Sequence, residues 1–220
     1  MSALLLWLLL LRPHAATVPP PQSLFWEDFE TCSAGDLGGQ HGWTLIAGSD
    51  PLASMNVQVD ASLGGAQLSC ATCYGSSCGI HTYSKLAPGG ALPSEFTLTF
   101  RVEIGEPYPA NTVYLGVYVT DTDNIGGPYS FAFQLYRVGG TDYYRACVNW
   151  GGCQQSIPWT GPTATIMVVH DSVSTSFYCD GGLATRFDST PVTPDRVLLD
   201  ISGDAPGLFG KIDDIRITSP

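Results

Sequence analysis

The stretch EFTLTFRVEI, residues 95–104, alternates apolar and polar side chains along almost its whole length. Its apolar positions are Phe96, Leu98, Phe100, Val102 and Ile104, and threonine, arginine and glutamate occupy the positions between them. Successive side chains of a β-strand point to opposite faces, so this period of two predicts a strand with one buried face.

The same alternation recurs along the rest of the chain, in runs bounded by Gly, Pro, Asp and Asn. No amphipathic helix interrupts the series. The further runs cover residues 111–120, 129–138, 142–150, 163–171, 174–182, 195–202 and 210–218. The sequence therefore predicts an all-β domain of at least eight antiparallel strands, which has to fold as two packed sheets or as a closed barrel.

The composition limits the classes of function. The chain has 220 residues, 44% of them hydrophobic, which suits one large β domain with a substantial core. Its net charge of −11 comes from 20 acidic and 9 basic residues. Nucleic acids and anionic membranes bind clustered Lys and Arg, so this charge argues against both as partners.

The N-terminal segment MSALLLWLLLLRPHAA has an apolar run from Ala3 to Leu11. That run is too short for a membrane span, which needs about 20 residues. We therefore predict a signal peptide over residues 1–16, a linker over 17–23 and one domain over 24–220. The expected location is outside the cytoplasm, as a secreted, cell-surface or periplasmic protein.

The chain contains seven cysteines, an odd number that leaves at least one of them unpaired in a monomer. Cysteine usage of this kind suits an oxidising compartment. We expect local bridges within Cys70–Cys78 and between Cys147 and Cys153. The alternative for CATCYGSSCGIH is a zinc site of Cys70, Cys73, Cys78 and His81, for which disulfide formation is the competing outcome.

Four segments in the right order resemble the concanavalin A-like lectin/glucanase superfamily, nearest its laminin-G-like branch. They are FWEDFETCSAGDLGGQHGW (25–43), EFTLTFRVEI (95–104), TIMVVHDSVSTSFYCDGGLATRF (165–187) and GKIDDIRI (210–217). The resemblance covers residues 24–220 and implies a jelly-roll sandwich of two antiparallel sheets, with the first and last strands side by side. Galactose-binding-like modules and MAM-type domains share part of this pattern and are jelly rolls too.

The last run, GKIDDIRIT, carries two adjacent carboxylates, so in a regular strand one of them shares the core-facing row of Ile215 and Ile217. A carboxylate on such a row needs a partner. The resemblance implies that both terminal strands bring their acids together, and oxygen ligands in a cluster suit structural Ca²⁺. The predicted calcium ligands are Glu27, Asp28, Glu30, Asp213 and Asp214. The alternative is that Lys211 and Arg216 neutralise one Asp while the other faces solvent.

A second acidic candidate is the loop DTDNIGG, with Asp121, Asp123 and Asn124. Spaced acids in a turn that contains glycine can bind Ca²⁺. Asp and Asn also occupy ordinary turns for conformational reasons, and we favour that interpretation here.

Aromatic and polar side chains fall on the positions that alternation turns outward on three of the runs. If these strands are neighbours, the side chains share one exposed face. Aromatic rings bind the apolar faces of sugars, and amide and guanidinium groups bind their hydroxyls. The predicted carbohydrate-binding residues are Tyr114, Tyr118, Gln134, Tyr136, Tyr143, Arg145 and Asn149. The alternative is that tyrosine is simply a good strand former on a half-exposed face. Trp150 and Trp159, in the loop that follows, are further candidates.

The patterns expected of enzymes are incomplete. Retaining glycoside hydrolases need two carboxyl groups about 5–5.5 Å apart, and the E-x-D-x-E strand that supplies them in this superfamily is absent. GIHTYSK offers His81, Tyr83 and Lys85, part of a polysaccharide lyase set, without its arginine. We therefore expect an exported carbohydrate-binding or adhesive module. The alternatives are a polysaccharide-degrading enzyme of the same fold and a structural surface domain.

Overall fold

The computed structural model describes residues 21–33, 35–48, 55–60, 65–70, 78–104, 113–122, 131–138, 141–148, 152–153, 157–158, 161, 163–188, 193–203 and 208–220. For part of the strand residues it describes only the backbone.

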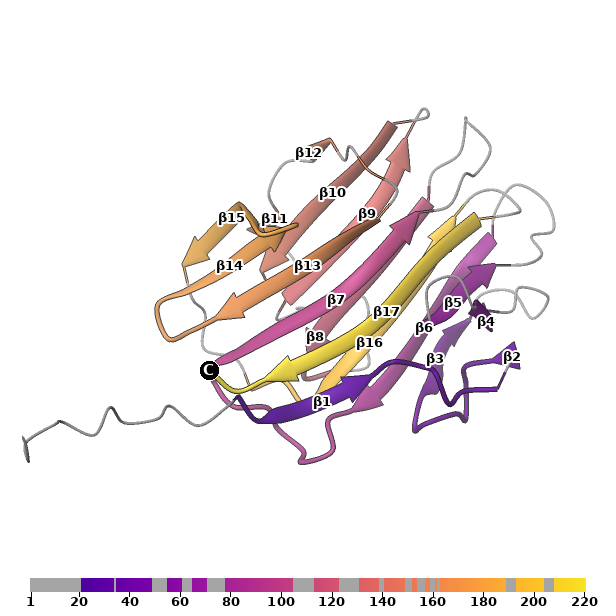
Figure 1. The fold of residues 1–220 in the computed structure, drawn as a ribbon, viewed down its shortest axis with the longest axis horizontal. Helices are drawn as coiled ribbons and strands as arrows, with labels where there is room; N and C mark the ends of the chain where they lie inside the picture. Colours follow the sequence, from indigo (N-terminus) through magenta and orange to yellow (C-terminus); the bar gives the residue numbers. More distant parts are fainter. Residues whose placement is uncertain are drawn as a thin grey trace, which may run out of the picture.

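The described chain forms two antiparallel sheets, which Figure 1 shows stacked on one another. The first sheet has nine strands: β1 (Ser23–Glu27), β2 (Gly35–Asp36), β4 (Met55–Asp60), β5 (Gly65–Cys70), β7 (Phe96–Ile104), β13 (Thr163–His170), β14 (Ser174–Cys179), β15 (Gly182–Asp188) and β17 (Leu208–Thr218). The second has eight: β3 (Thr44–Gly48), β6 (Cys78–Leu86), β8 (Val113–Thr120), β9 (Phe131–Val138), β10 (Thr141–Val148), β11 (Gly152–Cys153), β12 (Ile157–Pro158) and β16 (Arg196–Gly203). The predicted all-β two-sheet sandwich is confirmed.

The apolar rows read from the sequence form the core between the sheets. Phe96, Leu98 and Phe100 of β7 are buried there, opposite Val117 and Val119 of β8. All eight predicted runs are strands, because each can place one continuous apolar row against the other sheet.

A β-bulge in β17 explains the two adjacent aspartates. The pairing of β17 with β7 shifts register between Asp213 and Arg216, and Asp214 has a φ of 50°. The extra residue lets Ile212 and Ile215 both point into the core, although three positions separate them. The expectation that one aspartate occupies the core-facing row is therefore wrong: Asp213 lies opposite Arg101, on the side of β7 away from the core, and Asp214 is at the bulge.

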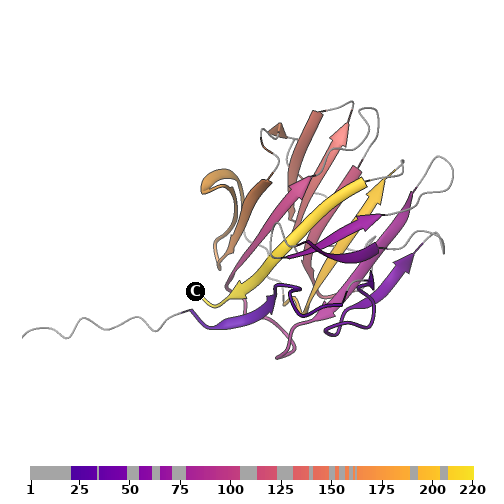
Figure 2. The ribbon, with the colours of Figure 1, turned by 45° about the vertical axis from the view of Figure 1, so that its right-hand side comes forward.

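The first and last strands lie side by side, as predicted (Figures 1 and 2). β1 pairs with the final part of β17, with Glu27 opposite Ile215. β5 pairs with the beginning of the same strand, from Leu208 to Lys211. The bulge thus lies where β17 changes its neighbour on that edge from β5 to β1.

Two polar contacts join the sheets at the end where β1 lies. Lys85 of β6 donates to Glu27 of β1, with Nζ 2.6 Å from Oε2. The hydroxyl of Tyr83, also on β6, donates to Asp36 of β2 across 2.6 Å. Burial would raise the pKa of Glu27, but the hydrogen bond and charge of Lys85, with the Trp43 indole, outweigh it and lower that pKa. Glu27 is therefore an ionised carboxylate in a nearly buried position.

The described cysteines follow part of the predicted arrangement. Cys147 and Cys153 form the expected disulfide, which connects β10 to β11. Cys32 and Cys179 are free thiols. The side chains of Cys70, Cys73, Cys78 and His81 lie outside the described residues, so the zinc and disulfide alternatives for them stay predictions. No helix in the described ranges is long and apolar enough to cross a membrane.

Candidate functional site

The three strands that carry the predicted tyrosine row are neighbours. β9 lies between β8 and β10, and the register sets Tyr114, Tyr136 and Tyr143 side by side. The next row on the same face holds Gly116, Gln134 and Arg145. The prediction that these positions share one face is confirmed, and this face points away from the core. We call it the outer face of the second sheet.

The prediction that the outer-face residues are exposed to solvent is wrong for Tyr118 and Gln134. Tyr118 is 3% exposed and Gln134 is 6% exposed. The absence of a side chain at Gly116 leaves space that the Tyr118 ring fills, because a Cβ there would lie 2.5 Å from the ring. Tyr118 also packs in a small cluster with three other buried residues of this face, Ala132, Cys147 and Leu198. Tyr118 is thus not available as a stacking platform.

Five side chains on the outer face make a continuous chain of hydrogen bonds, which we call the outer-face network. Its members, in order, are Arg145, Gln134, Tyr118, Asp200 and Thr82. Arg145 Nε donates to Gln134 Oε1, and Gln134 Nε2 donates to the Tyr118 hydroxyl across 2.5 Å. Tyr118 in turn hydrogen-bonds the carboxylate of Asp200, which also accepts from Thr82 Oγ1 at 3.1 Å.

Asp200 is the acid of this network, with Tyr118 on one side and Thr82 on the other. Burial raises its pKa to about 6, although the hydrogen bonds from Thr82 and Tyr118 act in the opposite direction. Its carboxyl group therefore gains and loses a proton near neutral pH. Sequence reasoning passed over Asp200, but the run DRVLLDIS held a signal: an acid at an alternating position within an apolar strand.

The other predicted sugar-binding residues have different placements. Tyr143 and Arg145 are half-buried at one end of the outer-face network. For Tyr114 and Tyr136 the structure describes only the backbone, and Asn149, Trp150 and Trp159 lie outside the described residues.

A cavity of about 430 Å³ lies at the other side of the outer face, where β3, β6 and β16 are neighbours. Its walls include Thr44, Ile46, Ser84 and Arg196. Ser84 pairs with Leu198, two residues before Asp200, so the cavity and the outer-face network occupy adjoining parts of one surface. The volume falls in the range of small-ligand sites.

The five predicted calcium ligands are brought only partly together. The charges of Asp28 and Asp214 both act on Asp213, whose pKa is raised mainly by its burial. Three of the five acids have a basic partner: Lys85 for Glu27, Arg101 for Asp213 at 3.7 Å and Arg216 for Asp214 at 3.0 Å. Glu27 points away from the others into the contact with Lys85 and Trp43. Glu30 is exposed.

The remaining sequence candidates are placed as follows. Tyr83 is buried in the core and bound to Asp36. Lys85 is bound to Glu27 between the sheets, and part of its side chain also lines the cavity. The lyase-like segment is therefore a pair of contacts between the sheets. Asp121 follows β8 and is exposed, and Asp123 and Asn124 lie outside the described residues.

Comparison with known proteins identifies the fold. No protein-family model and no curated protein sequence matches the chain. Solved structures do match. The CBM2 module of the Lactobacillus casei BL23 phage J-1 evolved Dit is 13% identical, with a TM-score of 0.63 over 90% of this chain and 96% of that one. The laminarinase catalytic domain of Thermotoga maritima MSB8 is 12% identical, with a TM-score of 0.59 over 91% and 98% of the two chains. Bacillus licheniformis β-glucanase is 15% identical, with a TM-score of 0.55 over 90% and 98%. These similarities show the concanavalin A-like β-sandwich fold.

Proposed function

From the premise that this chain is a concanavalin A-like β-sandwich, we propose that it binds carbohydrate on the outer face of its second sheet. The observation that carries the proposal is the outer-face network, which crosses five adjacent strands, from Arg145 on β10 to Thr82 on β6. A buried chain of this kind fixes the orientation of the group at its end, which lowers the entropy lost on binding.

The chemistry of the half-buried end suits a sugar. The guanidinium of Arg145 carries several donors for hydroxyl oxygens, and the ring of Tyr143 presents an apolar face to C–H groups. Gln134 accepts from Arg145 and holds it toward this surface. Tyr118 acts from below, as a positioning residue for Gln134, rather than by contact with the ligand.

The structural neighbours support a carbohydrate ligand. By name, one is a carbohydrate-binding module and two are glucan-degrading enzymes. At 12–15% identity they do not carry over a substrate or a catalytic residue. They do favour a glycan over the other ligand classes that an acidic β-sandwich can bind.

An enzyme of the same fold is the second candidate, and Asp200 is the observation that favours it. A carboxyl group with a pKa of about 6 can serve as a general acid near neutral pH. Two-carboxylate hydrolysis needs a second acid within about 5–10 Å. Among the described outward positions of β6, β8, β9, β10 and β16, Asp200 is the only acid. We therefore favour binding.

A glycan array tests the proposal directly. We expect the wild-type protein to retain one glycan class, and Arg145→Ala and Tyr143→Ala each to weaken that binding at least tenfold. Arg101→Ala is the matched control, because Arg101 lies on β7 in the opposite sheet. Unchanged binding in both outer-face variants, or no glycan retained at all, would reject the proposal. Release of reducing ends from the bound glycan, lost in Asp200→Asn, would favour the enzyme instead.

The calcium and export predictions accompany this function as proposals. Besides burial, the charges of Asp214 and Asp28 both raise the pKa of Asp213. Because Arg216 already forms an ion pair with Asp214, a cation would mainly relieve the repulsion between Asp28 and Asp213. We propose them as the ligands of a structural Ca²⁺ near the junction of β1 and β17. Export through the N-terminal segment would place the protein where extracellular glycans and calcium are both present.

A further inference from the structure

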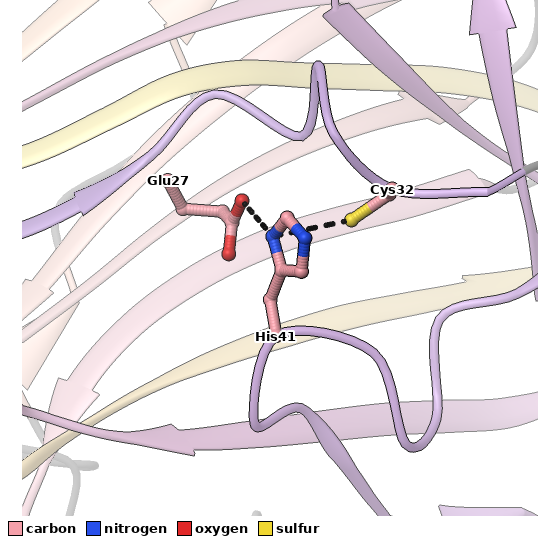
Figure 3. Close-up of side chains that lie close together, drawn as sticks. All are labelled: Glu27, Cys32 and His41. Carbon is pink, nitrogen blue, oxygen red and sulfur yellow. Dashed lines mark hydrogen bonds and ion pairs between the residues drawn. The ribbon is translucent and has the colours of Figure 1, made fainter.

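Three potential metal ligands meet beside β1, as Figure 3 shows. They are a carboxylate oxygen of Glu27, the thiol sulfur of Cys32 and a ring nitrogen of His41, and all three lie within 4.8 Å of one another. The imidazole of His41 lies between the other two, with Nδ1 3.2 Å from Glu27 Oε1 and 3.5 Å from Cys32 Sγ.

These separations match the edges of a tetrahedral zinc site. Zinc bonds are about 2.0–2.1 Å to nitrogen and oxygen and about 2.3 Å to sulfur. In a tetrahedron, such bonds place nitrogen and oxygen roughly 3.3 Å apart and nitrogen and sulfur roughly 3.6 Å apart. The two measured separations, 3.2 and 3.5 Å, are close to these values. The Glu27 oxygen and the Cys32 sulfur lie within 4.8 Å of one another, so this pair has to approach by at most about 1.2 Å to accept the ion.

Hydrogen bonds alone cannot satisfy both contacts of His41 Nδ1. His41 Nδ1 faces both a carboxylate and a thiol, but one ring nitrogen either donates a single proton or accepts with a single lone pair. If Nδ1 donates to Glu27, it offers no lone pair to the Cys32 S–H group. If it accepts from Cys32, its lone pair faces the Glu27 oxygen. A cation at the centre removes this conflict.

The surroundings hold the ligands in the orientation that a metal requires. His41 Nε2 lies 3.2 Å from Thr31 Oγ1, so an Nε2–H group can donate to that hydroxyl and leave the Nδ1 lone pair for the metal. The second oxygen of Glu27 accepts from Trp43 Nε1 at 3.0 Å and from Lys85 at 2.6 Å. Such outer contacts fix the orientation of ligands in metal sites.

We propose that Glu27, Cys32 and His41 bind a divalent metal ion of the zinc class, with three protein ligands and a fourth position for water or another small ligand. Binding replaces the S–H bond of Cys32 by a metal–sulfur bond, and the proton leaves to solvent. Glu27 and Cys32 are buried, whereas the His41 side chain is 32% exposed, so the ion enters from the His41 side. His41 and Lys85 also line the cavity described above.

The charged groups around this position would offset the charge of the ion. Glu27 and the Cys32 thiolate supply two negative charges, which offset the two positive charges of the metal. Lys85 adds one positive charge and Asp28, whose charge also acts on Cys32, adds one negative charge. A mixed N, S and O ligand set selects zinc over calcium and magnesium, which prefer oxygen ligands.

Cobalt(II) is the probe for the test, because a thiolate bound to Co²⁺ gives an intense charge-transfer band and a tetrahedral site gives strong visible bands. The full protein is freed of metal with a chelator under mild reduction that leaves Cys32 as a thiol, and then titrated with Co²⁺. We expect a charge-transfer band that saturates at one Co²⁺ per protein and disappears when Zn²⁺ is added. Zn²⁺ alone should raise the melting temperature.

Two variants and one matched control decide the site. Cys32→Ser should lose the charge-transfer band. His41→Asn should bind Co²⁺ at least tenfold more weakly, and Asn tolerates the φ of 47° at this position. Cys179→Ser, at the other free thiol, should leave the band unchanged. A band that persists in Cys32→Ser would assign the metal to other cysteines. Absence of the band in the reduced wild-type protein would mean a hydrogen-bonded cluster only. Either result overturns the proposal.

Discussion

Asp200 is 8% exposed, and its carboxylate accepts hydrogen bonds from Tyr118 and Thr82. Its run reads as an ordinary apolar strand, and one acid at an outward position suggests a solvent contact. The structure instead buries the carboxyl group under Tyr118 and Thr82. Alternation predicts which way a side chain points, but it does not predict what covers that side. The same limit made Tyr118 appear exposed.

The raised pKa of Asp200 predicts a pH-dependent stability. An acid whose folded-state pKa is raised from 3.8 to about 6 destabilises the fold progressively as pH rises through that window. A shift of about two units corresponds to roughly 2–3 kcal/mol above pH 6. We expect Asp200→Asn to be more stable than the wild type at pH 7 and nearly equal to it at pH 4, measured by denaturant unfolding at both pH values.

The control for this measurement is Asp121→Asn, which alters an exposed acid near the end of β8. Its stability relative to the wild type should not change between the two pH values. If the difference between Asp200→Asn and the wild type were also constant with pH, the carboxyl group would not be titrating in the folded state as described.

The proposed calcium site at Asp213 predicts that Ca²⁺ stabilises the protein through this residue. Adding Ca²⁺ to chelator-treated protein should raise the melting temperature by several degrees, because the ion offsets the repulsion between Asp213 and Asp28. Asp213→Asn should remove that response and leave any response to Zn²⁺ intact. A melting temperature that does not respond to Ca²⁺ in the wild-type protein would contradict the proposal.

Among the elements, β17 is the strand whose position was predicted but whose bulge was not. Its strand character follows from its isoleucines, and its contact with β1 follows from the resemblance. The bulge at Asp213 and Asp214 does not follow from either, because strict alternation assigns Ile212 and Ile215 to opposite faces. Three-residue spacing between two buried isoleucines is the local signal that would have indicated it.

The contact between β1 and β6 predicts an unequal effect of two similar substitutions. Lys85→Met should cost about 3 kcal/mol of unfolding free energy, because it leaves the buried Glu27 carboxylate without its cation. Arg216→Met removes the exposed partner of Asp214 and should cost less than about 1 kcal/mol. Denaturant unfolding at pH 7 compares them.

Unfolding at low pH tests whether the loss of the Glu27–Lys85 ion pair causes the lower stability of Lys85→Met. The folded-state pKa of Glu27 is lowered, so the contribution of the Glu27–Lys85 pair is present near neutral pH and is lost as pH falls through that pKa. The difference between Lys85→Met and the wild type should therefore shrink in acid. A difference that stays constant would point to lost packing of the lysine side chain instead.

At the scale of the whole molecule, the sequence predicted the architecture better than the surface. The eight strands were recoverable because their apolar rows need one shared core. The two-sheet arrangement and the adjacent terminal strands were recoverable from the family resemblance. The candidate site depends on contacts between residues distant in sequence, such as Thr82 with Asp200. No local pattern encodes such a contact, which arises only once β16 lies between β6 and β8.

The position of β17 predicts a global effect of truncation. β17 lies between β7 on one edge and both β5 and β1 on the other, so its removal divides the first sheet. We expect a chain that ends at residue 207 to show no cooperative thermal transition. A chain that begins at Pro21 should melt like the intact protein. A cooperative transition in the first variant would mean that the sheet can close without β17.

The central position of β17 in the first sheet also affects when the sheet can form during protein synthesis. β17 leaves the ribosome after every other strand of the sandwich, yet its neighbours β7, β5 and β1 were all made long before. Until it arrives, their unpaired edges are open to wrong partners, other nascent chains included. A polypeptide that closes its sheet this late cannot complete the sandwich until its last strand has been made.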